Sequence, residues 1–156
     1  MRLTVRTNLA MRTLMYCAVH TGRNIRTSEV AKATNASENH LGQVINMLGQ
    51  TGFIETVRGR GGGIRLARNA RDITVGGVFR VFEAGTPFAE CFDAESNTCP
   101  LAGTCRLKSY VARALDAFYH EMDLVTLDDA AIGGDNGPAA LAGDPALDLA
   151  PPDDPA

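Results

Sequence analysis

The sequence predicts a mainly α-helical fold with one small β-hairpin, in which a compact N-terminal region is followed by a loop and a long amphipathic helix. Three observations carry this prediction. Apolar residues recur at helical spacing in the N-terminal segments, two β-prone runs flank a glycine-rich stretch, and a last apolar stripe runs from Leu107 to Val125. With 156 residues, of which 45% are hydrophobic, the chain is long enough for one core plus an accessory segment.

The first two helices follow from their apolar spacing and their ends. Residues 8–21 form an amphipathic pattern with Cys17 on its apolar face, where a lone cysteine is most often a small core residue. A shorter helix is expected over residues 27–34, because Thr27 or Ser28 can cap its N-terminus. We give Cys17 no functional role.

A third helix follows a turn supplied by Asn35. Ser37 can cap this helix, and Gly52 is placed to end it. Its apolar positions repeat at helical spacing and are Leu41, Val44, Ile45 and Leu48. The order helix, turn, helix predicts that these two segments pack together as a helix-turn-helix.

Residues 53–57 and 64–67 are β-prone and flank the stretch "RGRGGG", which predicts a hairpin with a flexible, basic tip. A short helix over residues 74–84 then leads into a loop rich in glycine and proline. Beyond the loop, one long amphipathic helix is expected from its apolar positions, which are Leu107, Val111, Ala114, Phe118, Met122 and Val125. Because nothing downstream can cover this stripe, we expect the helix to pack against the rest of the domain and against a second copy of itself.

The two ends of the chain differ in charge. Residues 1–80 hold 12 lysines and arginines against four acidic residues, whereas residues 128–156 hold seven aspartates and no basic residue. A basic N-terminal half fits a domain that binds a polyanion, although scattered solvated arginines would give the same count. From about residue 130 the composition is Gly, Pro, Ala and Asp, which predicts a disordered acidic tail.

In a helix-turn-helix the second helix enters the DNA major groove. The side of the third helix opposite its apolar stripe carries amide side chains, which match the donor and acceptor pair on the edge of adenine, although an ordinary solvated face would look the same. A basic, glycine-rich hairpin tip beside it predicts a winged helix whose arginines approach phosphates or the minor groove. The expected DNA-binding residues are Ser28, Ser37, Asn39, His40, Gln43, Asn46, Arg58 and Arg60. A nucleotide-binding loop is the rival interpretation, but the stretch lacks the GKS or GKT ending of a P-loop.

Three of the four cysteines, Cys91, Cys99 and Cys105, lie in the loop, separated by seven and five residues. An odd number of thiols cannot all form disulfides within one chain, so a metal site, a reactive thiol or chance clustering remain. Structural zinc sites favour paired C-x2-C knuckles, which are missing here. Iron-sulfur clusters usually take four cysteines, so a three-cysteine set implies a weaker fourth ligand and a labile iron, as a sensor would need.

Four stretches together resemble a known family. The strings "MRLTVRTNLAMRTLMYCA", "SENHLGQVINML" and "TVRGRGGGIRLAR" and the three-cysteine loop are similar to the dimeric winged-helix iron-sulfur repressors that include NsrR, IscR and RirA, over about residues 1–127. "NHLGQVINML" and the cysteine loop look most like the nitric-oxide-sensing NsrR, while the cysteine spacing and "MRLT" also look like the iron-responsive RirA.

The resemblance implies that Cys91, Cys99 and Cys105 hold a [4Fe-4S] or [2Fe-2S] cluster, that a homodimer reads a palindromic operator in double-stranded DNA, and that nitric oxide destroys the cluster and releases DNA. Two positions depart from the family. Asn8 stands where some NsrR proteins have a ligating aspartate, and Lys108 stands where IscR proteins have a histidine. The fourth ligand therefore stays open among Asn8, Glu90, Asp93, Glu95 and water.

The sequence thus predicts a winged helix-turn-helix over residues 1–84, a cluster loop over 85–105, a dimerisation helix over 106–127 and a disordered acidic tail over 128–156. No secretory signal or membrane span is evident, which predicts a cytoplasmic protein. No catalytic constellation stands out, so we expect a regulator and not an enzyme. The alternatives are an iron-responsive regulator, a zinc or thiol redox regulator, and an electron-transfer protein with a basic docking face.

Overall fold

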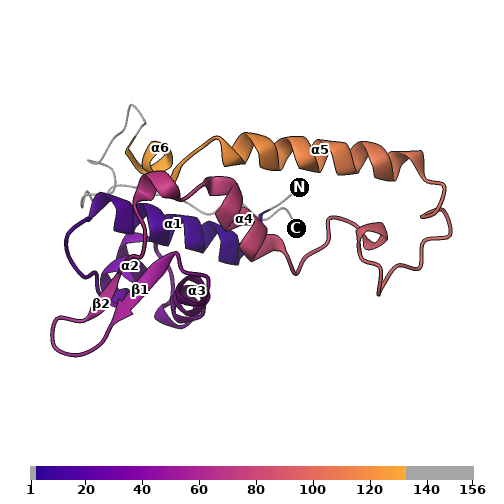
Figure 1. Ribbon diagram of the computed structural model, residues 1–156. Helices are drawn as coiled ribbons and strands as arrows, with labels where there is room; N and C mark the ends of the chain where they lie inside the picture. Colours follow the sequence, from indigo (N-terminus) through magenta and orange to yellow (C-terminus); the bar gives the residue numbers. More distant parts are fainter. Residues whose placement is uncertain (1–2, 133–156) are drawn as a thin grey trace.

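The computed structural model describes residues 3–132. Four helices, a hairpin and a short last helix form a compact body, and a long helix projects from it with the cysteine loop at its far end (Figure 1). In chain order the elements are α1 (Val5–Val19), α2 (Thr27–Ala33), α3 (Glu38–Gln50), β1 (Ile54–Val57), β2 (Gly63–Leu66), the 3-10 turn η1 (Ala70–Asp72), α4 (Val75–Glu83), the 3-10 turn η2 (Glu90–Phe92), α5 (Arg106–Asp123) and α6 (Leu127–Ile132). The predicted fold class, mainly helical with a two-stranded antiparallel wing, is confirmed.

The first helix begins earlier than its apolar pattern suggests. Thr4 caps α1, because its hydroxyl accepts a hydrogen bond from the Thr7 amide at 3.2 Å. The buried Thr7 hydroxyl donates to Glu83, at the end of α4, and Glu83 also accepts from the Thr4 amide at 2.9 Å. These bonds hold the start of α1 against the end of α4, directly before the cysteine loop.

The helix-turn-helix follows the predicted pattern with one shift. The N-cap of α2 is Arg26 and not Thr27 or Ser28, because the Glu29 carboxylate accepts the Arg26 amide at 3.0 Å and extends the helix start by one residue. Asn35 makes the turn with a φ of 50°, a left-handed conformation that asparagine tolerates. Ser37 caps α3 as expected, accepting from the His40 amide at 3.3 Å.

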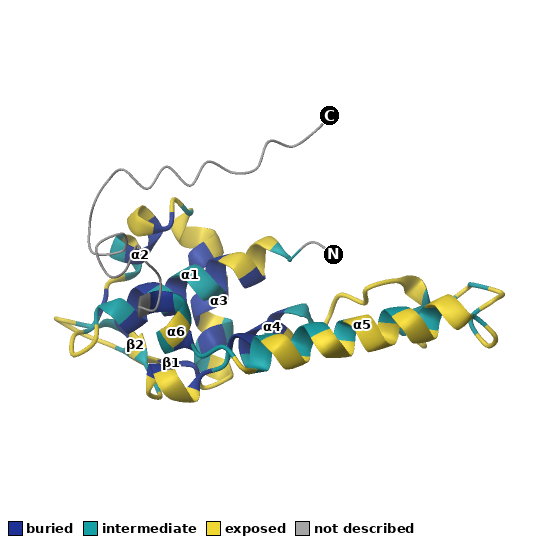
Figure 2. Ribbon diagram, turned by 90° about the horizontal axis from the view of Figure 1, so that it is seen from above, coloured by how far each residue is buried: buried dark blue, intermediate teal, exposed yellow. Residues whose placement is uncertain are grey.

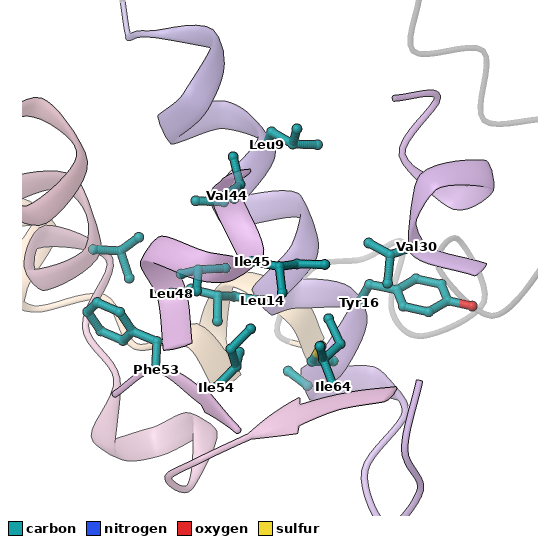
Figure 3. Packing of buried hydrophobic residues seen from close by; sticks show 14 of the residues in the cluster. Leu9, Leu14, Tyr16, Val30, Val44, Ile45, Leu48, Phe53, Ile54 and Ile64 are labelled. Atoms are coloured by element: carbon teal, nitrogen blue, oxygen red, sulfur yellow. The ribbon is translucent and has the colours of Figure 1, made fainter. Parts of the chain in front are cut away.

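The core lies between α1, α3 and the hairpin (Figure 3). Side chains from all three elements meet there: Leu14, Leu48 and Ile64 are at most 2% exposed. In the hairpin, Ile54 pairs with Leu66 and Val57 with Gly63. Helix α3 therefore buries one face in this core and leaves the opposite face outside.

The long helix α5 joins the body near its C-terminal end. Arg80 of α4 donates to both carboxylate oxygens of Asp123, at 2.5 and 2.6 Å, and the Phe79 and Phe118 rings stack at 6.1 Å. No residue of α5 is buried, as the yellow and teal ribbon in Figure 2 shows. The helix ends at Asp123, earlier than predicted, because Val125 continues as extended chain and its carbonyl accepts from the Val75 amide at 2.9 Å.

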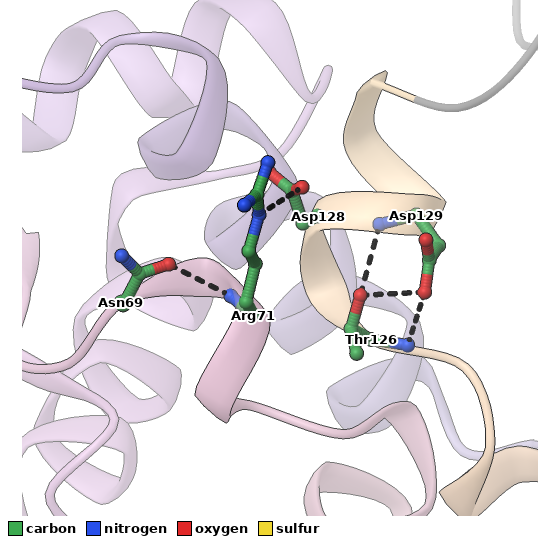
Figure 4. A network of polar contacts seen from close by, with 5 residues as sticks. All are labelled: Asn69, Arg71, Thr126, Asp128 and Asp129. Atoms are coloured by element: carbon green, nitrogen blue, oxygen red, sulfur yellow. Dashed lines mark hydrogen bonds and ion pairs between the residues drawn. The ribbon is translucent and has the colours of Figure 1, made fainter.

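Residues 128–132, predicted as the start of a disordered tail, instead belong to α6. Leu127 is fully buried, and its amide donates to the Ile73 carbonyl at 2.7 Å. Thr126 and Asp129 cap the helix reciprocally, and Arg71 pairs with Asp128 at 3.0 Å (Figure 4). Helix α6 packs on α1 and η1. The rest of the predicted tail, residues 133–156, lies outside the described residues.

Candidate nucleic-acid interface and cysteine loop

The predicted reading face of α3 is on the surface. Asn39, His40, Gln43 and Asn46 are all exposed, and so is the cap Ser37. The opposite face of the same helix is buried through Leu41, Val44, Ile45 and Leu48. Since the buried residues fix the rotation of α3 in the core, the amide side chains are held facing outward. Ser28, at the start of α2, is exposed as well.

The hairpin presents the two predicted arginines at its tip. Arg58 and Arg60 are exposed, and the turn with Arg60 and Gly61 at its centre closes with a hydrogen bond from the Gly62 amide to the Gly59 carbonyl at 2.9 Å. Gly59 and Gly61 have φ angles of 95° and 87°, which L side chains rarely adopt. The glycines are therefore required by the turn, and the tip offers two cations with little other bulk around them.

A surface hollow lies between α3 and β1, beside the reading face. It is lined by Ile45, Asn46, Gly49, Gln50, Ile54, Glu55, Thr56 and Val57. Within the hairpin, Glu55 pairs with Arg65 at 2.8 Å. Sequence reasoning did not anticipate the hollow, because it depends on how β1 packs against α3. Only the exposed polar residues Gln50 and Thr56, near the predicted face, could have suggested it.

The three loop cysteines are free and partly exposed, and each occupies a different local structure. Cys91 lies in η2, Cys105 directly precedes α5, and the Cys99 amide donates to the Asn97 side chain at 3.1 Å. Within residues 3–132, no three cysteine, histidine or acidic side chains lie together as a metal site would require. The structure thus places all three thiols in one segment but does not bring them to one point.

The donor set nevertheless suits a thiophilic metal group. Three unpaired thiols, accessible in a short segment free of regular strands, are the ligand type that iron-sulfur clusters use. Cys105 also stands at the N-terminus of α5, where the helix dipole favours an anionic ligand. The residues fit such a group chemically, and the loop would have to close around it.

The candidate fourth ligands differ in availability. Both oxygens of Asp93 are occupied, by the Ser96 hydroxyl at 2.6 Å and the Glu95 amide at 3.0 Å, and these bonds hold the pKa of its carboxyl below the ordinary value. Glu90 accepts a longer bond from Thr98 at 3.4 Å. Asn8 is exposed on α1. Each carboxylate oxygen has two acceptor sites, so these bonds do not prevent Asp93 from ligating, and the fourth ligand stays open among Asn8, Glu90, Asp93, Glu95 and water.

The structure also shows the surroundings of Lys108 and Cys17, which the sequence analysis singled out. The Lys108 ammonium lies 5.8 Å from the centroid of the Phe92 ring, on the loop side of α5. Cys17 is 2% exposed in the core, and burial raises the pKa of its thiol to about 12. Such a thiol is a poor nucleophile and metal ligand, in agreement with a packing role.

The family model of Rrf2, described as "Iron-dependent Transcriptional regulator", matches residues 3–132. The chain belongs to the Rrf2 family. This Rrf2 chain is 43% identical to protein aau3 of Rhizobium meliloti over 83% of its own length and 84% of the relative. It is 41% identical to the HTH-type transcriptional regulator NsrR of Bacillus subtilis, over 83% of its length and 89% of the relative.

Solved structures of Rrf2 proteins share the fold. T. potens IscR matches with a TM-score of 0.67 and 26% identity, covering 83% of this chain and 85% of the other. CymR, the global cysteine regulator of B. subtilis, matches with a TM-score of 0.68 and 25% identity, covering 84% and 96%. The resemblance found in the sequence is therefore confirmed, and the protein is an Rrf2 transcriptional regulator and not an enzyme. No helix of this regulator within residues 3–132 is long and apolar enough to cross a membrane.

Proposed function

We propose that the protein is a homodimeric, cytoplasmic repressor that binds a palindromic operator and releases it when nitric oxide damages an iron-sulfur cluster held by Cys91, Cys99 and Cys105. The observation that carries the proposal is the set of three free, partly exposed thiols in one loop of a chain from a family described as iron-dependent. The relatives named NsrR add support for nitric oxide as the signal.

The DNA-binding part of the proposal rests on α3 and the wing. An exposed row of amide side chains suits base edges in the major groove, and Arg58 and Arg60 suit the phosphate backbone beside it. Ser28, Ser37 and His40 would add contacts near the helix N-termini, which are favourable positions for phosphate. A second copy related by two-fold symmetry would present the same set to the other half of a palindrome.

The dimer is supported by the surface of α5. Leu107 and Tyr110 are 67% and 58% exposed, and no residue of this helix is buried within the single chain. The stripe that contains Val111, Ala114 and Phe118 is continuous with them. Packing α5 against its copy would remove this apolar surface from water.

A cluster, when bound, would supply iron that a small molecule can attack at the weakly ligated position. The chain's own part is to connect the loop to the DNA-binding body. One end of the loop follows Glu83, which is bonded to Thr4 and Thr7 of α1, and the other end enters α5. If closing of the loop around the cluster shifts α5 relative to α1, the cluster can favour the arrangement that fits DNA, and loss of the cluster removes that preference.

The test compares Cys99→Ala with Cys17→Ala, both purified without oxygen. Cys99→Ala should lose iron, visible absorbance and specific binding to an operator selected from a random duplex library by the wild-type protein. Cys17→Ala is the matched control and should keep all three, because its thiol is buried away from the loop. Specific binding retained by iron-free Cys99→Ala would refute cluster-dependent repression.

Iron-responsive control with the same cluster is separated by titration. If chelation of iron releases the operator at doses where nitric oxide does not, the signal is iron. A thiol redox regulator is a second candidate, because the three cysteines are not gathered and CymR shares the fold. Elemental analysis of oxygen-free protein distinguishes them: iron and sulfide support the cluster, zinc supports a zinc site, and absence of metal with oxidant-dependent binding supports thiol chemistry.

A further inference from the structure

The loop between α1 and α2 is in direct contact with the wing. The Asn24 side-chain amide donates to the Gly61 carbonyl at 3.1 Å, across 37 positions of sequence. The next residue, Ile25, pairs with Ile64 of β2 through two backbone bonds, of 2.9 and 2.8 Å. The loop thus lies against β2 of the hairpin through an isolated antiparallel β-bridge at Ile25.

The strands of the wing and its tip are held differently. At Gly63, which pairs with Val57 where the strands meet the tip, a Cβ would stand 2.4 Å from the Ile25 carbonyl oxygen, so the two backbones approach as closely as glycine permits. Beyond this pair, residues 58–62 carry two exposed arginines among three glycines. Among the hydrogen bonds of the described residues, the bond from Asn24 is the one that reaches this tip from outside the hairpin.

The same loop is fixed at its other end to the helix-turn-helix. Glu29 of α2 accepts from the Arg23 guanidinium at 2.8 Å and from the Arg26 amide at 3.0 Å. Helix α2 packs on α3. A chain of contacts therefore runs from α3 through α2 and the α1–α2 loop to Gly61.

We propose that Asn24 is a positioning residue for DNA binding, which holds the wing tip so that Arg58 and Arg60 meet the DNA backbone at a fixed height relative to the reading face of α3. This inference rests on the DNA-binding role of the wing proposed above. Asn24 need not touch DNA itself. It acts through Arg58 and Arg60, because a glycine-rich tip without the bond has many more conformations to lose on binding.

The consequence is measurable as affinity for any duplex. Loss of one neutral hydrogen bond that orders the tip should weaken binding about three- to tenfold. Because Arg60 would no longer neutralise its phosphate, the slope of log affinity against log salt should fall by about one, as it should for Arg60→Ala itself. A purely structural defect would lower affinity without this change in slope.

The experiment is a double-variant cycle with Asn24→Ala, Arg60→Ala and the two together, using fluorescence anisotropy on a labelled mixed-sequence duplex over a range of salt. If Asn24 acts through the tip, its substitution costs less in the Arg60→Ala background than in the wild type, because only Arg58 is then left to position. Additive losses, or an unchanged slope in Asn24→Ala, would overturn the inference while leaving the DNA-binding proposal standing. Failure of the wild-type protein to bind any duplex would overturn both.

Asn69→Ala is the matched control. Asn69 is an exposed asparagine, whereas Asn24 is half-buried, and the Asn69 side chain accepts from the Arg71 amide at 3.0 Å, outside the hairpin. Its thermal midpoint should resemble that of Asn24→Ala, and its DNA affinity should equal that of the wild type. Equal losses of affinity in the two asparagine variants would also contradict the inference, because the effect would then not be specific to the wing.

Discussion

Replacing a helical glycine by alanine should have opposite effects on stability at Gly76 and at Gly42. Gly76 lies where α4 meets the end of α5, and a Cβ there would stand 2.2 Å from Asp123 Oδ1 and 2.9 Å from the Asp123 backbone nitrogen. The carboxylate can swing away by giving up its bonds to Arg80, but the nitrogen can move only with α5. Gly42 of α3 is exposed, and a Cβ added there would have nothing within 4 Å.

Two effects compete at these sites. Alanine is favoured over glycine in a helix by about 1 kcal/mol, whereas forcing a methyl group into a packed contact costs about 1–3 kcal/mol. Gly42→Ala has only the first effect and should gain up to about 1 kcal/mol. Gly76→Ala has both, and because one of its close contacts is with backbone its packing cost lies in the upper part of that range, about 2–3 kcal/mol, so it should lose about 1–2 kcal/mol on balance.

Urea unfolding followed by far-UV circular dichroism measures both free energies. Adding Asp123→Ala to Gly76→Ala should recover only part of the loss, because the backbone contact remains. A Gly76→Ala protein as stable as the wild type would refute the close packing of α4 against the root of α5. It would also remove the evidence that the C-terminal end of α5 is held rigidly against α4.

Three further outcomes are expected. Thr7→Val keeps the shape of a buried side chain but removes the donor to Glu83, and should cost about 1–3 kcal/mol in urea unfolding; an unchanged midpoint would contradict the bond. Ser37→Ala removes the cap of α3, so it should lower the free energy of unfolding in urea by about 1 kcal/mol and weaken DNA binding. Equal unfolding free energies of Ser37→Ala and the wild type would contradict the cap. Hydrogen bonds from the Thr126 side chain and amide lower the pKa of Asp129, so their stabilisation of α6 is present above the ordinary carboxyl range and is lost as pH falls through the lowered value. The methyl NMR signals of Leu127 should report this acid transition, and Asp129→Asn should abolish it.

The fold could be predicted wherever a short pattern decides the structure. Ser37 before an apolar repeat specified α3 and its outward face, and glycines around Arg58 and Arg60 specified the hairpin tip. Both depend on neighbours in sequence. Helix α6 could not be predicted, because its composition resembles the tail and its order comes from burying Leu127 and from contacts with η1.

Parts of the candidate site could likewise be predicted from the sequence, and parts could not. Exposure of the amide row follows from the apolar stripe on the other side of α3, so the sequence was sufficient for it. The bond from Asn24 to Gly61 joins segments 37 positions apart and leaves no pattern in either. Grouping of Cys91, Cys99 and Cys105 in one loop was visible from spacing, whereas their relative positions depend on the path of residues 84–105.

The attachment of α5 at one end makes it a lever. Its 18 residues span about 27 Å, so a turn of roughly 10° about the joint at Asp123 would carry the far end about 5 Å. Conversely, a displacement of about 5 Å at the cysteine loop corresponds to a rotation of only about 10° at Asp123. Contraction of the loop by a few ångströms would therefore change the angle between α5 and the body of the protein only slightly. In a dimer that packs through α5, this change of angle would alter the distance between the two α3 helices.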